Sequence, residues 1–294
     1  MQKKIWQLTN LCLITSGAII GLETLQSASA NAATLWSTLS PNSAQAFSSQ
    51  SNAAIGSETA DDFFFLNSLA PQFEVEGIKV NGLLSDPDAE ITNVRVELYR
   101  SFPVDSDATR TTDIVRLNGP ADDAFAAFDS GEGSLSYSVT DKGSFTVDST
   151  ITPGSLTNLG AVGSGLTGNL RQIDITLTDS ILLDAAATPL DQANHYFLAT
   201  TVETSQGDYY WLAGDQPPTT VGDRQAWLRT EPFVPDWIRV SDIINDEPGT
   251  LAPAFNASFE VSGKPVPEPS TAVGTLALGG IALGLSKLRK RRAI

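Results

Sequence analysis

The stretch Val94-Arg95-Val96-Glu97-Leu98-Tyr99-Arg100 is the clearest guide to the fold class of this chain. Apolar and polar side chains alternate along it with a period of two residues. The apolar members therefore project to one side of an extended chain, and the polar members project to the other side. This alternation is typical of a β-strand that buries one of its faces.

The same alternation recurs in short runs along the middle of the chain, for example in Leu135–Val139, Ile173–Leu177 and Phe255–Val261. In Phe73–Val80 the phase slips by one residue at Gly77, which predicts a β-bulge there. No window of this region shows a 3.6-residue helical repeat over 12 residues. About ten strands at this spacing predict an all-β fold, namely an antiparallel β-sandwich of jelly-roll-like form over residues 58–263.

Turn-forming residues separate these runs and predict their connections. Asp141-Lys142-Gly143 and Ser205-Gln206-Gly207 each lie between two alternating runs, so each predicts a β-hairpin. The Ser-, Ala- and Asn-rich segment 31–57 is expected to be irregular, and Pro120–Gly133 is expected to form a long loop.

The first 30 residues have the composition of a secretory signal peptide. Two lysines precede the apolar stretch Leu8–Leu22, and an Ala-x-Ala site follows it. Signal peptidase is expected to cut after Ala30, with Ala32 and Ala33 as alternatives. The single cysteine, Cys12, lies inside this segment, so the mature chain forms no disulfide and has no cysteine nucleophile.

The other end of the chain predicts a membrane anchor. Residues 271–286 are uncharged and span about 24 Å as a helix, the short end of what a bilayer core requires. A basic cluster follows, which would stop translocation and stay in the cytoplasm. Its members are Lys287, Arg289, Lys290, Arg291 and Arg292.

The segment before this anchor, Val266-Pro267-Glu268-Pro269-Ser270-Thr271, resembles the PEP-CTERM sorting signal of bacterial surface proteins. The resemblance covers the tail 264–294 and implies that Pro267, Glu268 and Pro269 are recognised by an exosortase-type enzyme. It implies an exported protein at the cell envelope, outer surface or extracellular space, transiently anchored in the inner membrane. A plain C-terminal anchor behind a Pro-rich linker is the alternative.

The middle of the chain also resembles a family of PEP-CTERM proteins. The resemblance is carried by Thr59–Phe63, Val94–Pro103, Asp208–Leu212, Pro235–Val240 and Pro253–Phe259, among other segments. It implies that most of Glu58–Gly263 is one domain, and it implies no activity.

Charge excludes one class of partner. The region Asn31–Lys264 holds 11 basic and 32 acidic residues, a net charge near −21. Nucleic-acid binding requires a basic footprint, so a nucleic-acid partner is not expected. Such a charge favours solubility and suits an exterior rich in divalent cations.

Single residues suggest two further kinds of chemistry. The only histidine, His195, lacks a nucleophile elbow elsewhere in the sequence and is expected to be structural. Calcium prefers clustered oxygen ligands on loops, which makes Asp86, Asp88 and Asp105 candidate ligands, although no EF-hand pattern is present.

Aromatic residues concentrate in the second half of the chain. Tyr210 and Trp227 are candidates for a sugar-stacking platform. Tyr209 and Trp211 share the opposite face of their strand, so one of the two sets is expected to be core. Trp237 is expected to be buried.

These patterns predict an exported, non-enzymatic protein of the cell surface or extracellular matrix. One alternative is a secreted module that binds calcium or extracellular polysaccharide. A second alternative is a glycan-acting hydrolase, which would show two close carboxylates in a cleft, one of them with a raised pKa.

Overall fold

The computed structural model describes residues 32–53, 56–68, 70–112, 114, 116–155, 158–188, 193–215, 226–244 and 255–267, apart from the side chains of Ser155 and Asn158. The predicted signal peptide 1–30 lies outside these residues. So do Glu268, Pro269, the predicted helix 271–286 and the basic cluster at its end. Within the part of the chain that is described, no helix has the length and apolar character needed to cross a membrane.

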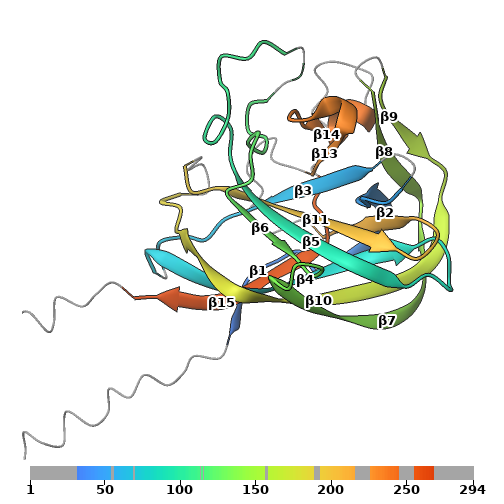
Figure 1. Cartoon of the computed structure of the whole chain (residues 1–294), viewed down its shortest axis with the longest axis horizontal. Helices are drawn as coiled ribbons and strands as arrows, with labels where there is room; N and C mark the ends of the chain where they lie inside the picture. The colour runs from blue at the N-terminus through green and yellow to red at the C-terminus, as the bar shows by residue number, and fades with distance from the viewer. Residues whose placement is uncertain are drawn as a thin grey trace, which may run out of the picture. The chain divides into compact units, whose positions relative to one another are not determined.

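Two β-sheets build the domain, which confirms the all-β prediction (Figure 1). The six-stranded sheet has the order β14 (Ile238–Arg239), β13 (Trp227–Thr230), β3 (Ser57–Phe63), β11 (Tyr196–Thr204), β5 (Ile91–Arg100) and β6 (Ala126–Asp129). A 3-10 turn, η1 (Glu231–Phe233), and a short helix, α1 (Val240–Ile244), flank β14.

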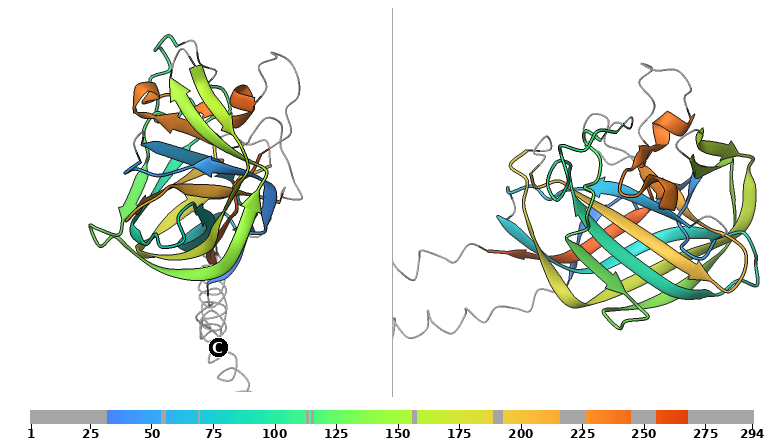
Figure 2. Two further views of the ribbon diagram at one scale, coloured as in Figure 1. Left: turned by 90° about the vertical axis from the view of Figure 1, so that its right-hand side faces the viewer. Right: turned by 45° about the horizontal axis from the view of Figure 1, so that its top comes forward.

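The nine-stranded sheet curls into a half-barrel (Figure 2). Its main path is β1 (Ala33–Ser37), β15 (Phe259–Val266), β4 (Gln72–Leu84), β12 (Tyr209–Gly214), β2 (Pro41–Ser48), β8 (Ser149–Ser155) and β9 (Asn158–Gly163). On the other side of β4 lie β10 (Leu166–Asp184) and then β7 (Leu135–Val147). The β2–β8 pair is parallel, and the other ladders of both sheets are antiparallel.

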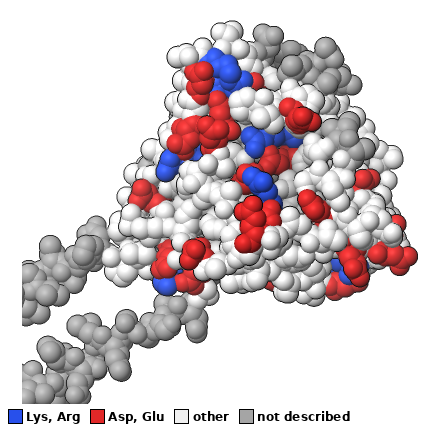
Figure 3. Space-filling view, in the orientation of Figure 1, with Lys and Arg blue, Asp and Glu red and all other residues white. Residues whose placement is uncertain are grey.

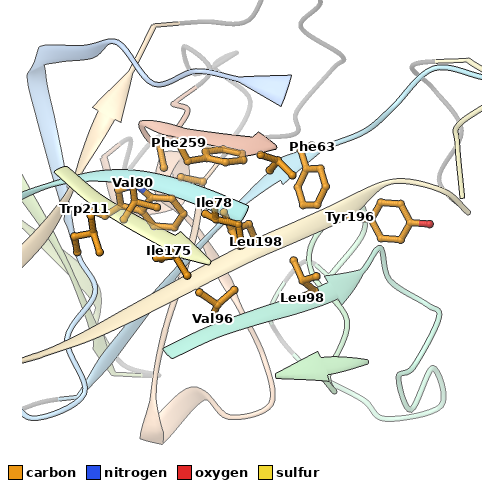
Figure 4. Packing of buried hydrophobic residues seen from close by; sticks show 14 of the residues in the cluster. Phe63, Ile78, Val80, Val96, Leu98, Ile175, Tyr196, Leu198, Trp211 and Phe259 are labelled. Carbon is orange, nitrogen blue, oxygen red and sulfur yellow. The ribbon is translucent and has the colours of Figure 1, made fainter. Parts of the chain in front are cut away.

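The hydrophobic core lies between the two sheets (Figure 4). Phe63, Leu98 and Leu198 face it from the six-stranded sheet, and Trp211 and Phe259 face it from the larger sheet. All five are buried, and full burial of such a side chain contributes roughly 1.5–3 kcal/mol. The two apolar faces therefore hold the sheets together.

The predicted bulge at Gly77 is confirmed. Along β15, Ser262 pairs with Gly77 and Gly263 pairs with Val75, so the intervening residue of β4 has no partner there. A Cβ atom on Gly77 would lie 2.9 Å from the Ser262 hydroxyl and 3.1 Å from the Ile175 carbonyl oxygen. The close approach of both neighbouring strands explains a glycine at this position.

The first predicted hairpin is wrong, because β7 runs straight through Asp141-Lys142-Gly143. The strand pairs with β10 on both sides of this stretch, and the register shifts between Asp141 and Gly143. Gly143 has φ of 90°, and its N–H donates to Asp141 Oδ1 at 2.7 Å. The turn-like residues therefore form a bulge, since the 19-residue strand β10 provides a continuous partner.

The second predicted hairpin is also wrong. Ser205-Gln206-Gly207 connects β11 of the six-stranded sheet to β12 of the nine-stranded sheet. The chain therefore passes from one sheet to the other at this turn. Strand β11 pairs with β3 and β5, and β12 pairs with β2 and β4.

The segment 31–57, expected to be irregular, contains β1 and β2. Strand β1 pairs with the last strand, β15, and β2 pairs with β12. The expected loop Pro120–Gly133 contains the short strand β6. Strands β1 and β2 are defined by partners far away in the sequence, whereas β6 pairs with the preceding strand β5.

Candidate functional site

The outer face of the six-stranded sheet carries a group of charged and aromatic side chains, which we call the outer cluster. It consists of Glu58, Arg95, Glu97, Tyr99, Arg229 and Trp237. Figure 3, drawn in the orientation of Figure 1, shows acidic and basic side chains next to one another over this sheet.

Strand register brings the cluster together. Arg229 on β13 pairs with Glu58 on β3. Glu97 on β5 is the register partner of Ala199 on β11, which in turn pairs with Ala60 of β3. Because alanine is small, side chains from β3 and β5 can meet over the strand that separates them.

Hydrogen bonds link the members in a chain. The Arg229 guanidinium donates from Nε to the Glu58 carboxylate and from Nη2 to the Tyr99 hydroxyl oxygen, the latter at 2.5 Å. The Tyr99 hydroxyl donates to Glu97 Oε2 at 3.0 Å, and Arg95 Nη2 donates to Glu97 Oε1 at 2.6 Å. Each charged group therefore has a partner of opposite charge.

Aromatic rings enclose the central cation. The Arg229 guanidinium lies 4.1 Å from the Trp237 ring centroid and 5.2 Å from that of Tyr99. The Trp237 indole N–H donates to the Ala121 carbonyl oxygen at 3.1 Å, which ties the β5–β6 connection to this face. The arrangement combines cation–π attraction with removal of the cation from water.

The two glutamates of the cluster have opposite pKa shifts. Burial, together with a hydrogen bond to Glu97 and the charge of that residue, raises the pKa of Glu58 to about 7. Burial alone would also raise the pKa of Glu97, but hydrogen bonds from Glu58 and Arg95 lower it below its usual value. Below neutral pH, Glu58 is therefore the proton donor of the pair and Glu97 is the carboxylate.

This pair has one feature expected of a carboxylate hydrolase, but its geometry differs from such a site. Glycosidase carboxyl groups stand roughly 5–10 Å apart so that a sugar or water fits between them. Glu58 and Glu97 are close enough to shift each other's pKa, and their side chains are only 17% and 9% exposed. Each of the two carboxyl groups also accepts a hydrogen bond from an arginine, so the pair is better suited to holding strands together.

His195 lies on the same outer face and is completely buried. Its Nε2 atom is 2.5 Å from Asp62 Oδ2, and its ring packs against Phe64 and Phe197. A fully buried imidazole cannot meet a substrate, which agrees with the structural role expected for it.

Asp61, the neighbour of Asp62 in β3, points in the opposite direction and into the core. It is fully buried, and its Oδ2 atom accepts the Ala257 N–H at 2.7 Å. Among the described residues, its Oδ1 atom has no hydrogen-bond partner. Burial and the nearby charge of Asp62 raise the pKa of Asp61 well above its usual value. Burial therefore favours the neutral form of this carboxyl group in the folded protein.

The predicted calcium ligands are not brought together. Asp86 and Asp88 lie in the β4–β5 turn, where the Asp88 N–H donates to Asp86 Oδ1 at 2.8 Å. Asp105 follows the other end of β5, and Arg100 Nη1 donates to its carboxylate at 2.8 Å. Over the described parts of the chain, no three His, Cys, Asp or Glu side chains are placed to hold a metal.

The two candidates for a sugar-stacking platform, Tyr210 and Trp227, are not brought together. Trp227 is completely buried on the six-stranded sheet, whereas the half-buried Tyr210 belongs to the nine-stranded sheet. The two rings therefore share no surface. Trp237 is buried, as expected, and the face of β12 that carries Tyr209 and Trp211 is the one that belongs to the core.

The sequence did not predict the ion network that lies above the outer cluster. Arg110 makes two hydrogen bonds of 2.7 Å to the Asp236 carboxylate, and Arg116 pairs with Asp122. The backbone of Gly119 lies directly on the Trp227 ring, since a Cβ atom there would meet it at 2.8 Å. These contacts fasten the β5–β6 connection over the sheet and bury its outer face.

Comparisons with protein-family models, curated proteins and solved structures found no match to this chain.

Proposed function

We propose that this chain is an exported protein of the cell surface or extracellular matrix with a structural or interaction role. Signal peptidase would remove residues 1–30, and an exosortase-type enzyme would act on Pro267-Glu268-Pro269. The two-sheet domain would be the part delivered to the exterior. We also propose that the two sheets form a jelly-roll-like sandwich.

One observation carries it: the folded domain fits between the two sorting segments. Strand β1 begins at Ala33, three residues after the expected cut at Ala30. Strand β15 ends at Val266, directly before Pro267, which is exposed. A cut after Ala30 would therefore leave every strand complete, whereas a cut after Ala33 would remove the first residue of β1.

A second observation supports the non-enzymatic role. The ionisable groups of the outer cluster are paired with one another, Glu97 and Tyr99 among them are buried, and His195 is fully buried. Pairing of these groups across β3, β5 and β13 links the strands, which supports a structural role for them.

Mass spectrometry of both ends of the protein from its native host tests the proposal. We expect an N-terminus at Asn31 and a C-terminus that lacks the basic cluster. A mature chain in which Pro267-Glu268-Pro269 is still joined to Arg292 would contradict exosortase processing. A chain that begins at Met1 and is found in the cytosol would contradict export.

A further inference from the structure

A second, smaller hydrophobic cluster lies on the face of the nine-stranded sheet that points away from the main core. Leu84 of β4 belongs to the main core, so its neighbour Leu83 points to the opposite face. Five strands each contribute one buried residue to the second cluster: Ala46 of β2, Leu83 of β4, Val147 of β7, Leu170 of β10 and Leu212 of β12.

The sheet wraps around this second cluster. Strand β7 ends at Val147 and β8 begins at Ser149, so the chain passes directly from the β10 side of the sheet to the β2 side (Figure 1). The N–H of Asp148 between them donates to the Ser43 carbonyl oxygen of β2 at 2.8 Å. Openings beside curled sheets of this kind are common positions for ligands.

A pocket of about 360 Å³ opens beside the second cluster. Leu39, Pro41 and Leu170 form its apolar wall, and Leu170 belongs to the cluster as well. Ser40 and Gln172 bring hydrogen-bonding groups to the same pocket. Its volume lies within the range of small-molecule sites, roughly 300–1,000 Å³.

Hydrogen bonds fix the wall of this pocket. The buried Asn81, which also lines it, donates from Nδ2 to the Leu39 carbonyl oxygen at 2.5 Å and to Ser258 Oγ at 3.0 Å. The Asp215 N–H donates to the Ser40 carbonyl oxygen at 2.9 Å. The β1–β2 connection is therefore held against β4, and its shape is set before a ligand arrives.

Lys142 lines the pocket and supplies a positive charge. In the described parts of the chain, every other lysine and arginine side chain forms an ion pair with Asp or Glu. Lys142 forms none there, although acidic residues outnumber basic ones. The adjacent carboxylate, Asp141, lies 2.6 Å from Arg171 and accepts the Gly143 N–H at 2.7 Å. The bulge in β7 therefore leaves the Lys142 ammonium group free to pair with a ligand.

These groups favour one class of ligand. An ammonium group attracts a carboxylate, and the Ser40 hydroxyl can donate to or accept from a ligand hydroxyl. Gln172 Nε2 donates to the Asp174 carboxylate at 3.0 and 3.1 Å, which leaves the amide oxygen to accept a hydrogen bond. A sugar acid combines a carboxylate, hydroxyl groups and an apolar ring face. A neutral sugar would not use Lys142, and a fatty acid would not use Ser40 and Gln172.

We propose that the pocket between the β1–β2 connection, β4, β7 and β10 binds a sugar acid, whose carboxylate pairs with Lys142. This inference goes beyond the proposed function, because it assigns a ligand class to the domain. It does not depend on the sorting tail.

A ligand-observed NMR titration tests the proposal on residues 31–294 held in lipid nanodiscs. The probes are glucuronate, glucose and cyclohexanecarboxylate. We expect glucuronate to bind with a Kd in the millimolar range, and the other two probes to bind at least about threefold more weakly. The affinity for glucuronate should decrease as the salt concentration rises. Equal binding of glucose, or of cyclohexanecarboxylate, would overturn the assignment to sugar acids.

Two variants and a matched control locate the site. Lys142→Gln should weaken glucuronate binding at least about threefold and leave glucose binding unchanged. Lys264→Gln makes the same change of charge beside Glu74, near the start of β4, and should leave glucuronate binding unchanged. Ser40→Asp places a carboxylate at the exposed rim and should reduce binding below detection.

Equal losses in the Lys142 and Lys264 variants would overturn the proposal, because they would show attraction by overall charge. Absence of glucuronate binding to the original chain would also overturn it. Unchanged thermal unfolding would show that the variants are folded. Either negative result would leave the proposed export intact, since mass spectrometry of the chain ends tests export separately.

Discussion

The two faces of the six-stranded sheet are covered by different interactions, the inner face completely and the outer face in large part. The inner face presents apolar side chains such as Phe63 and Leu198 to the second sheet. The outer face presents Glu58, Glu97 and Arg229, which are mostly removed from water and paired with one another or with Arg95, Tyr99 and Trp237. Alternation along a strand therefore identifies its two faces, but it does not reveal whether the polar face meets water.

The two kinds of burial should also differ in energy. Apolar burial contributes in proportion to area, so it is the main source of stability. Buried ion pairs offset much of their attraction by the loss of hydration, so their removal as a pair costs little, whereas removal of one partner costs more. The predictions below test this contrast in order of decreasing effect.

The largest effect is expected on the inner face. Trp211→Ala removes a completely buried ring that packs on Phe259 and donates to the Ser258 carbonyl at 2.9 Å. We expect a loss of about 3–5 kcal/mol in the free energy of unfolding, measured by urea denaturation. Trp237→Ala on the outer face should cost less, because the loops above it can close over the space. A larger cost for Trp237→Ala would show that the outer face dominates.

Removal of the central cation should come next. Arg229→Met leaves Glu58 without its cationic partner and the Tyr99 hydroxyl without a donor, and we expect a loss of about 3 kcal/mol at pH 8. The double variant Arg229→Met/Glu58→Gln should recover part of this loss, because no uncompensated carboxylate remains on β3. A double-mutant cycle from urea unfolding gives the coupling. Additive losses would mean that the two residues do not interact.

A smaller effect should appear as pH dependence. Glu58 keeps its proton in the folded state up to pH about 7, whereas its usual pKa is 4.5. The folded state therefore binds more protons between these values, and this residue makes stability fall as the pH rises from about 5 to about 7. Glu58→Gln removes the titration, so its Tm relative to the original chain should increase with pH over this window. A constant difference in Tm would contradict the raised pKa.

The smallest effect is expected for an ion pair on an open face. Lys79 lies 2.7 Å from Glu260 on the nine-stranded sheet, and its side chain is 39% exposed. Lys79→Ala should cost less than about 1 kcal/mol, and the cost should decrease further in high salt. A loss comparable to that of Arg229→Met would remove the distinction between buried and open pairs.

Part of the fold could be predicted because it depends on local pattern. The alternation in β5 and the slipped phase at Gly77 both appear in the structure. The two hairpins could not be predicted correctly, because turn residues do not specify which strand comes next to which. The strand content of 31–57 was missed for the same reason, since β1 depends on a partner at the other end of the chain.

The outer cluster was beyond prediction because three separate strands assemble it. Glu58 and Arg229 are 171 residues apart, and Tyr99 and Arg229 are 130 residues apart. The alternation in β5 does place Glu97 and Tyr99 on one face. It contains no information about the arginine that β13 brings to them.

The pairing of β1 with β15 has a consequence for how the domain is made. The Thr38 side chain bonds to the Phe259 carbonyl, 221 residues further along. A ribosome makes β1 first and its partner β15 last. Because β15 lies between β1 and β4, both of these strands lack a partner on that side until the whole chain is made. Contacts of such high sequence separation form slowly. The domain therefore cannot close while its C-terminal strand is still being synthesised, and a chain truncated before Phe259 would expose two unpaired edges to neighbouring molecules.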